Sequence, residues 1–497
     1  MAGNAPTWNE YEVSLPGGLA RHVRSLTGQP VVAEIDAGAQ PAEVQLRLPI
    51  PDLSGHPTPR DKAKYLLETA AEVEHTLMVQ YLYAAYSLKS SDEVTDPTQQ
   101  DLLDDQLEDS WPQTLRGIAR EEMGHLMTVQ NLLAVLALAP NLEREDFPVP
   151  EGLYPFTLKL QPLTQSSLAK YVVAEAPGDA ADIGDIIELA KEKQGSAINR
   201  VGILYALLAM IFARQDQIEP GATGDPDWDA TVLAISHFAY AADPERGHWH
   251  LDDGAFHPET LEQQADPDDW NAGQLRVDRI ADRADAVQAI RFIGVQGEGL
   301  AGETDASHFG RFLRIFRGVN GDGAFPPPGG WVPTRAVPEN PTADQFGHER
   351  TRRWAELADA RYALLLGFIG HYLVAAGERR QTLTRWIFAE MRSALRFIAR
   401  ELTEMPANEE PNSTERGAAP FTLRPPLALP DDEAARWRVH KDRTADAIAV
   451  IEALRGADTP DPHDAFLAGL LASDKTRLNK MTEMAEQAQP ALGITGD

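Results

Sequence analysis

The sequence predicts a mainly α-helical protein built around a four-helix bundle, with additional helices towards the C-terminus and a short N-terminal segment of β or irregular structure. Three observations lead to this fold class. Long segments carry apolar residues every three or four positions, which is the period of one helix face. Pro- and Gly-rich sequence with short alternating runs is concentrated in the first 58 residues. The hydrophobic content of 43% is ordinary for a globular protein.

We expect four regions along the chain. Residues 1–58 form an accessory segment, in which 31–37 and 43–50 resemble strands, and residues 59–320 form the bundle. Residues 321–455 form a helical extension that packs on the bundle, after a Pro/Gly-rich stretch at 321–333, and residues 456–497 are a polar tail. The helical pattern covers 61–88, 115–139, 186–213, 284–295 and 308–319 in the bundle, and 348–376, 380–404 and 431–455 in the extension.

Composition excludes several classes of function. The chain has no cysteine, so any metal site must use His, Asp and Glu. The formal charge of −31 would repel nucleic acid and anionic membrane surfaces. Neither a signal peptide nor a membrane-spanning run is recognisable, and we expect a cytoplasmic protein that acts on a small molecule, with a homo-oligomer as an open alternative.

The segment 61–88 places a carboxylate on its apolar face. Apolar residues recur from Leu67 to Ala85 at helical spacing, and Glu74 lies in the middle of this stripe. A carboxylate in an apolar interior is unfavourable unless it is paired, protonated or bound to a metal. Glu74 is therefore a candidate ligand, whereas Glu68 and Glu72 point to other faces.

The segment 115–139 repeats this pattern with two residues. Glu122 and His125 fill the gap in the apolar stripe, and their spacing of three puts both side chains on one helix face. This is the Glu-x-x-His arrangement of metal sites in helical bundles, although the same spacing also occurs by chance on solvated faces. Glu121 lies off the stripe.

Two further segments can complete a site for two metals. Such a bundle site needs a Glu from each of two helices and a carboxylate-x-x-His from each of the other two. Glu298 follows the segment 284–295, and Asp305-x-x-His308 begins the segment 308–319. Three other interpretations remain open: Glu298 as a charge in a glycine turn, Asp305 as a helix N-cap and His308 as a core histidine.

Another Glu-x-x-His pair competes with these residues. Glu245 and His248 have the same spacing, with His250 and His257 close by. Gly247 and Gly254 interrupt any long helix there, so we interpret the stretch as a surface loop, with Glu245 and His248 as an alternative ligand source.

Several segments, in order, resemble a known family. VEHTLMVQYLYAAYSL (73–88), IAREEMGHLMTVQNLL (118–133), NRVGILYALL (199–208), AVQAIRFIGVQGEG (286–299) and SHFGRF (307–312) are similar to the signatures of the bacterial ferritin-like family that includes the iminophenylpyruvate dimer synthases of violacein- and rebeccamycin-type pathways. The resemblance implies a ferritin-like bundle with metal ligands at Glu74, Glu122, His125, Glu298 and His308, and a role in secondary metabolism. The sequence departs from the family in the first helix, where Thr76 to Gln80 lacks the family's proline pair.

These features predict a metal-dependent oxidoreductase. A pair of iron ions, with Asp305 as a further ligand, would activate dioxygen to oxidise a small organic molecule; manganese and zinc remain alternatives. An imine-dimerising enzyme and a non-catalytic ferritin-like metal-binding scaffold are the two other hypotheses. No residue is assigned as a catalytic acid or base.

Overall fold

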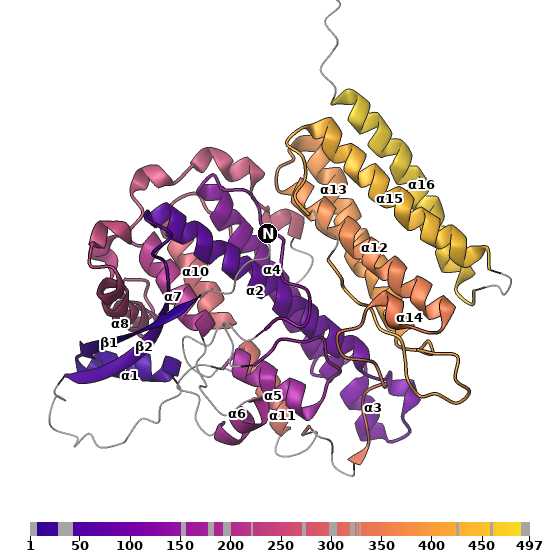
Figure 1. The fold of residues 1–497 in the computed structure, drawn as a ribbon, viewed down its shortest axis with the longest axis horizontal. Coiled ribbons are helices and arrows are strands. Elements are labelled where there is room, and N and C mark those ends of the chain that lie inside the picture. Colours follow the sequence, from indigo (N-terminus) through magenta and orange to yellow (C-terminus); the bar gives the residue numbers. More distant parts are fainter. Residues whose placement is uncertain are drawn as a thin grey trace, which may run out of the picture. The chain divides into compact units, whose positions relative to one another are not determined.

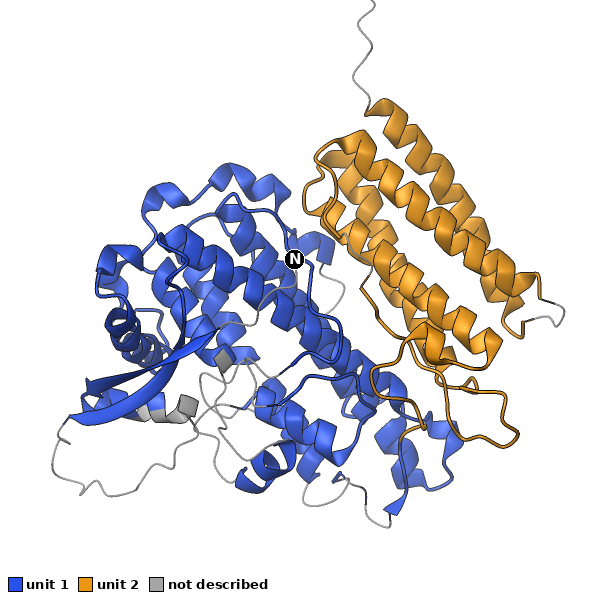
Figure 2. Cartoon of the chain, in the orientation of Figure 1, with its two compact units in different colours: residues 1–333 blue, residues 334–497 orange. Residues whose placement is uncertain are grey.

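The computed structural model describes the chain at residues 7–27, 43–150, 156–176, 183–191, 200–219, 222–270, 275–297, 306–318, 324–325, 327, 330–423, 427–457 and 461–488. These residues are mainly helical, as the sequence predicts (Figure 1). The chain divides into two compact units, residues 1–333 and 334–497 (Figure 2). This division lies beyond the predicted boundary at residue 320. Of the helices described, none is long and apolar enough to cross a bilayer.

Unit 1 begins with a small antiparallel sheet. Strands β1 (Trp8–Leu15) and β2 (Val44–Pro51) pair along their whole length, with Trp8 opposite Pro51. The predicted strand at 43–50 corresponds to β2, whereas the one at 31–37 lies outside the described residues. Helices α1 (Gly17–Thr27) and α8 (Pro226–Ala242) pack beside the sheet.

Four helices form the centre of unit 1. They are α2 (Pro59–Ser87), α4 (Trp111–Val135), α7 (Arg200–Phe212) and α10 (Arg283–Gln296). Helix α2 packs along α4 and also contacts α7, while α10 contacts both α7 and α4 (Figure 1). The remaining helices of this unit are α3 (Pro97–Leu103), α5 (Gln165–Ala174), α6 (Gly184–Ala190), α9 (Pro267–Trp270) and α11 (His308–Arg317).

The two longest bundle helices begin at defined caps. Thr58 accepts a hydrogen bond from the Asp61 amide, and the Asp61 side chain accepts one from Thr58 in return, with Pro59 as the first helical residue. Ser110 caps α4 in a similar way. The caps fix the residue at which each helix begins. The positions of the apolar stripes of α2 and α4 then determine which side chains face the bundle centre.

Unit 2 is a second group of packed helices. It contains α12 (Glu349–Tyr372), α13 (Gly377–Ala389), a π-helical turn (Glu390–Leu395), α14 (Arg396–Leu402), α15 (Glu433–Arg455) and α16 (Asp464–Gln487). The stretch expected to be a polar tail from residue 456 contains α16, which packs along α15 and buries Leu467, Leu471 and Met481. Polar residues are spread along α16, so the single apolar face that the helix buries is not evident from its composition.

The core of unit 2 contains a buried ion cluster. Arg361 donates to Glu390 through Nε at 2.8 Å and to Asp474 through Nη1 at 2.6 Å, and Arg477 also pairs with Glu390. Arg361, Glu390 and Asp474 are completely buried, and Arg477 is 8% exposed. Removing one partner would leave a buried charge uncompensated, which is far more costly than replacing the whole cluster.

We therefore expect Arg361→Leu to lower the free energy of unfolding of unit 2 by about 3–5 kcal/mol. The matched control is Arg353→Leu on the same helix, because Arg353 pairs with Glu349 near the surface and its loss should cost no more than about 1 kcal/mol. Hydrogen exchange of α12 peptides at increasing urea concentration measures both. Equal losses in the two variants would contradict the role given to the cluster.

A buried histidine pair makes unit 2 sensitive to acid. His371 Nδ1 lies 3.0 Å from His440 Nε2, and Glu433 faces the other side of His371. Burial lowers the pKa of His371 and holds that of His440 well below its usual range, with His371, Arg443 and Arg436 adding to the effect on His440. The folded unit keeps both rings neutral, whereas unfolded histidines take up protons near pH 6.5.

The stability of unit 2 should therefore be fully present above about pH 6.5 and fall as the pH drops below it. Hydrogen exchange of α12 and α15 peptides at pH 7.5 and 5.5, corrected for intrinsic exchange rates, measures the change. His440→Leu should make this pH dependence smaller. Greater protection at pH 5.5 than at pH 7.5 in the unsubstituted protein would contradict the predicted loss of stability in acid.

Candidate metal centre

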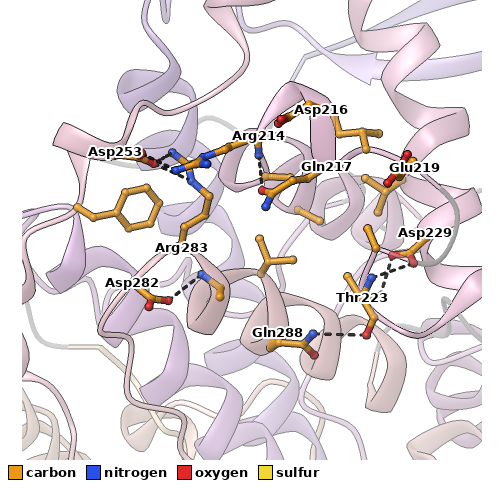
Figure 3. A pocket seen from close by; sticks show the side chains of 18 of the residues that line it. Arg214, Asp216, Gln217, Glu219, Thr223, Asp229, Asp253, Asp282, Arg283 and Gln288 are labelled. Carbon is orange, nitrogen blue, oxygen red and sulfur yellow. Dashed lines mark hydrogen bonds and ion pairs between the residues drawn. The ribbon is translucent and has the colours of Figure 1, made fainter.

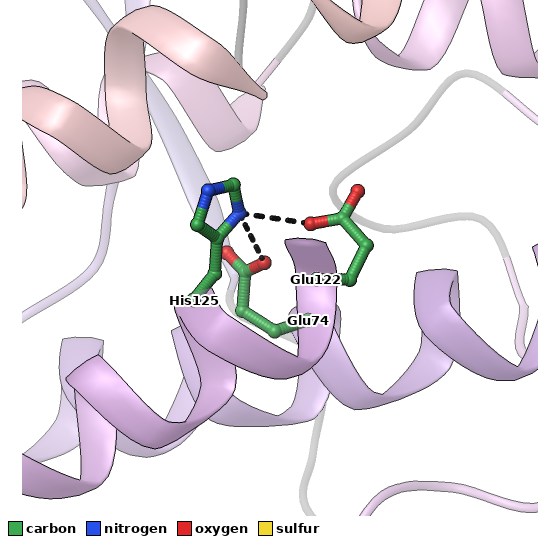
Figure 4. Close-up of side chains that lie close together, drawn as sticks. All are labelled: Glu74, Glu122 and His125. Atoms are coloured by element: carbon green, nitrogen blue, oxygen red, sulfur yellow. Dashed lines mark hydrogen bonds and ion pairs between the residues drawn. The ribbon is translucent and has the colours of Figure 1, made fainter. Parts of the chain in front are cut away.

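The first group of candidate ligands lies between α2 and α4. Glu74 comes from the middle of α2, and Glu122 and His125 come from successive turns of α4, so all three converge (Figure 4). His125 Nδ1 lies 2.9 Å from Glu122 Oε2 and 3.3 Å from Glu74 Oε2. The structure thus brings together the three residues that the apolar stripes of these segments predict.

A second group shares one residue with the first. His308 is the first residue of α11, and Glu175 is the C-cap of α5. His308 Nδ1 lies 3.1 Å from Glu122 Oε1 and 3.4 Å from Glu175 Oε2. Glu122 therefore belongs to both groups and presents one carboxylate oxygen to each, which is the position of a bridging ligand.

The chemistry of these two groups fits metal ions. Each group gathers two carboxylates and one imidazole whose ligand atoms lie within 4.8 Å of one another. All five residues are no more than 2% exposed. Among the described residues, Glu74 Oε2, Glu122 Oε1, Glu175 Oε2 and His308 Nδ1 make close histidine–carboxylate contacts but no well-formed hydrogen bond, although buried polar atoms normally have one. Cations placed between these atoms would satisfy them.

The charges in the centre shift the pKa of every ligand. Burial raises the pKa of Glu74 to about 7 and also raises that of Glu175. Burial opposes ionisation of Glu122 as well, but the charges of the nearby His308 and His125 outweigh it and hold the pKa of Glu122 well below the usual range. Burial likewise opposes protonation of His125, yet Glu122 and Glu74 raise its pKa to about 10. Without cations the centre therefore holds protons that metal binding would displace.

Two tyrosines orient Glu74 and Glu175, the two carboxylates that the ligand groups do not share. Tyr205 on α7 donates to Glu74 Oε1, and Tyr81 on α2 donates to Glu175 Oε1. In both cases the other oxygen, Oε2, faces the histidine of the same group. The two phenols thus hold Glu74 and Glu175 with one oxygen directed into the centre.

An outer hydrogen-bond network holds both imidazoles. His125 Nε2 lies 3.0 Å from Gln296 Oε1, and Gln296 Nε2 donates to Glu121 Oε2 at 2.9 Å. Glu121 Oε2 also lies 3.0 Å from His308 Nε2, and Arg311 pairs with the same carboxylate. Since the amide and carboxylate oxygens can only accept, both histidines must donate from Nε2, and their Nδ1 atoms are the ones available to a metal.

Gly297 allows the chain to pass close to the centre. A Cβ atom at this position would lie 3.3 Å from His125 Cε1 and 3.4 Å from His308 Nδ1, closer than most real contacts. Gly297 follows Gln296, so the same short segment both anchors His125 and leaves room beside the two imidazoles.

The other predicted ligands have different outcomes. Glu298 and Asp305 lie outside the described residues. Glu245 and His248 form an exposed ion pair of 3.0 Å in a short 3₁₀ turn. Within the described part of the chain, neither of these two residues joins a group of three or more possible metal ligands.

Two residues of the site were not predicted. Glu175 is the C-cap of α5, a short helix that was not predicted. The one indication in the sequence is the mainly apolar run Tyr171 to Ala174, which the structure buries and which leads directly to this carboxylate. Glu121 was placed off the apolar stripe, which is correct, but Arg311 and His308 on α11 cover that side of α4. No pattern within the segment 115–139 reveals this partner.

A separate cavity of about 770 Å³ lies among α7, α8 and α10 (Figure 3). Arg214 and Arg283 in its wall both donate to Asp253, and Asp229 accepts from Thr223. Its size is that of a small-molecule site, but none of the five candidate ligands lines it. These charged side chains are engaged with one another, and none of the described residues that line the cavity belongs to a group of three possible metal ligands.

Similarity to known proteins is found at the level of a family. A search of curated proteins found no match. A solved ferritin-like protein from Caulobacter vibrioides is 17% identical, with a TM-score of 0.33; the match covers 66% of this chain and 93% of that one. A family model described as ferritin-like matches residues 67–317, half of the chain, and this range contains all five residues of the two ligand groups. The chain therefore belongs to the ferritin-like family.

Proposed function

We propose that this protein binds two metal ions and uses them to oxidise a small organic molecule. The observation that carries the proposal is the pair of buried ligand groups that share Glu122. Glu74, Glu122 and His125 would hold one ion, and Glu122, Glu175 and His308 the other. Iron is the metal we propose, because a mixed carboxylate and imidazole set suits a redox-active ion of this kind; manganese and zinc are the alternatives.

A bound iron pair would supply dioxygen activation, and the protein supplies the environment for it. Tyr205 and Tyr81 hold the oxygens of Glu74 and Glu175 in position. Phe312 packs against Tyr81, with ring centres 4.9 Å apart. The burial of all five ligands excludes bulk water from the centre.

The substrate class rests on the sequence motifs. The segments around Glu74, Glu122 and His308 resemble the subgroup that includes the iminophenylpyruvate dimer synthases. On this resemblance we propose a substrate from secondary metabolism, and the imine-dimerising reaction of that subgroup is the alternative to oxidation.

Metal content tests the ligand assignment. We expect about two iron or manganese ions per chain after anaerobic loading and removal of free metal. Glu122→Ala should lose both ions, because Glu122 serves both groups, whereas Glu74→Ala should lose only one. Glu68→Ala is the control, since Glu68 lies on the same helix as Glu74 but pairs with Lys64 near the surface. Circular dichroism confirms that each variant is folded.

Retention of both ions by folded Glu122→Ala would contradict the bridging role. If the folded protein binds no metal under any of these conditions, the proposed function is wrong, and a non-catalytic ferritin-like scaffold is the remaining hypothesis.

Oxygen consumption tests the redox part separately. The protein loaded with ferrous iron should consume dioxygen faster than the same concentration of free iron, and the zinc-loaded protein should consume none. Glu122→Ala should return the rate to that of free iron. An iron-loaded protein that is no faster than free iron would rule out the oxidase while leaving metal binding intact.

A further inference from the structure

The inner ligands of the two proposed metal positions match closely. Within the described part of the chain, each position has Glu122, one further carboxylate and one imidazole, and each further carboxylate accepts a hydrogen bond from a tyrosine. Both histidines are buried and direct Nδ1 towards the carboxylates. The inner set alone would therefore give two positions of similar affinity.

The outer partners of the two histidines differ. His308 Nε2 donates to the carboxylate of Glu121 at 3.0 Å, whereas His125 Nε2 donates to the neutral amide oxygen of Gln296 at 3.0 Å. The distances are equal, so the difference between the two contacts is one of charge.

Glu121 is held as a carboxylate by Arg311. Arg311 Nη1 donates to Glu121 Oε1 at 3.0 Å, and Nη2 pairs with Oε2. The side chain of Glu121 is 13% exposed, so solvent screens it only partly. Arg311 and Gln296 also donate to Glu121, so they partly neutralise its negative charge and weaken its influence on His308. A carboxylate nevertheless remains behind His308 and not behind His125.

A carboxylate behind a ligating histidine strengthens the imidazole as a donor. Loss of such an outer partner typically lowers metal affinity 10- to 100-fold. An amide acceptor fixes the ring in the same way but adds no negative charge. His308 is therefore the stronger donor of the two.

We propose that the two metal positions are unequal and that Glu121 makes them so. The position formed by Glu122, Glu175 and His308 fills first, and the position formed by Glu74, Glu122 and His125 fills second. Glu121 acts through His308 as a positioning residue. This inference rests on the proposed binding of two metals and adds the order in which they bind.

Stepwise titration of the full chain with Co²⁺ tests the order, because the visible absorption of Co²⁺ reports its ligands as well as its occupancy. We expect two steps that differ at least about 10-fold in affinity. The tight step should persist in Glu74→Ala and disappear in Glu175→Ala. This pair of variants assigns each step to a position.

Substitution of the outer partners then tests the cause. Glu121→Gln should weaken the tight step about 10- to 100-fold and leave the weak step nearly unchanged. The double variant Glu121→Gln/Gln296→Glu moves the carboxylate from His308 to His125. In this variant the order should reverse, so that adding Glu74→Ala, rather than Glu175→Ala, removes the tight step.

Two further variants keep the test interpretable. Gln296→Leu removes the acceptor of His125 and also the amide that donates to Glu121, so it should weaken the second step without weakening the tight step. This variant keeps the inference testable if Glu121→Gln does not fold. Glu68→Gln is the surface control and should change neither step. A purely structural role of Glu121 would weaken both steps together and would not reverse their order.

The outcomes separate the two proposals. Two Co²⁺ ions that bind with equal affinity, or an order that the double variant does not reverse, would overturn this inference and leave the two-metal site standing. A folded protein that binds no Co²⁺ would overturn the proposed function and this inference with it.

Discussion

The shared carboxylate of Glu122 is the constraint on which the centre of this protein depends. Its two oxygens face two different histidines, His125 from the same helix and His308 from α11, and the side chain is 1% exposed. Burial of a carboxylate costs several kcal/mol unless opposite charge compensates it. Two imidazoles, or the metal ions that replace their protons, supply that charge. Because Glu122 is shared, α2, α4, α5 and α11 must all meet at one point.

Much of the surrounding structure serves to aim these side chains. Tyr205 and Tyr81 each occupy one oxygen of a carboxylate and leave the other for the centre. Glu121 and Gln296 fix the tautomer of both imidazoles from outside. Gly297 leaves the space that any larger residue would fill. Each of these outer contacts contributes little to stability by itself. Together they orient the five ligands so that their donor atoms converge.

The sequence was sufficient for the part of the site that lies on long amphipathic helices. Glu74, Glu122 and His125 interrupt apolar stripes, and an interrupted stripe identifies an inward polar residue without knowledge of the partner. His308 could be recognised from its place at the start of a short apolar segment. The same reasoning predicts the bundle helices α2, α4, α7 and α10, although α7 is buried at every position from residue 201 to 212.

The remaining features depend on contacts between distant segments. Glu175 ends a ten-residue helix, which is too short to show a gap in a periodic stripe. Glu121 faces outward from α4, and only the packing of α11 gives it His308 and Arg311 as partners. Helix α16 buries a narrow face against α15, so its composition resembles a solvated tail. In each case tertiary packing, rather than local pattern, determines the role of the residue.

Anomalous diffraction from crystals of the iron- or manganese-loaded protein tests the central claim most directly. We expect two anomalous peaks, one on each side of the Glu122 carboxylate, with His125 Nδ1 next to one peak and His308 Nδ1 next to the other. A single peak, or two peaks that do not share Glu122, would contradict it.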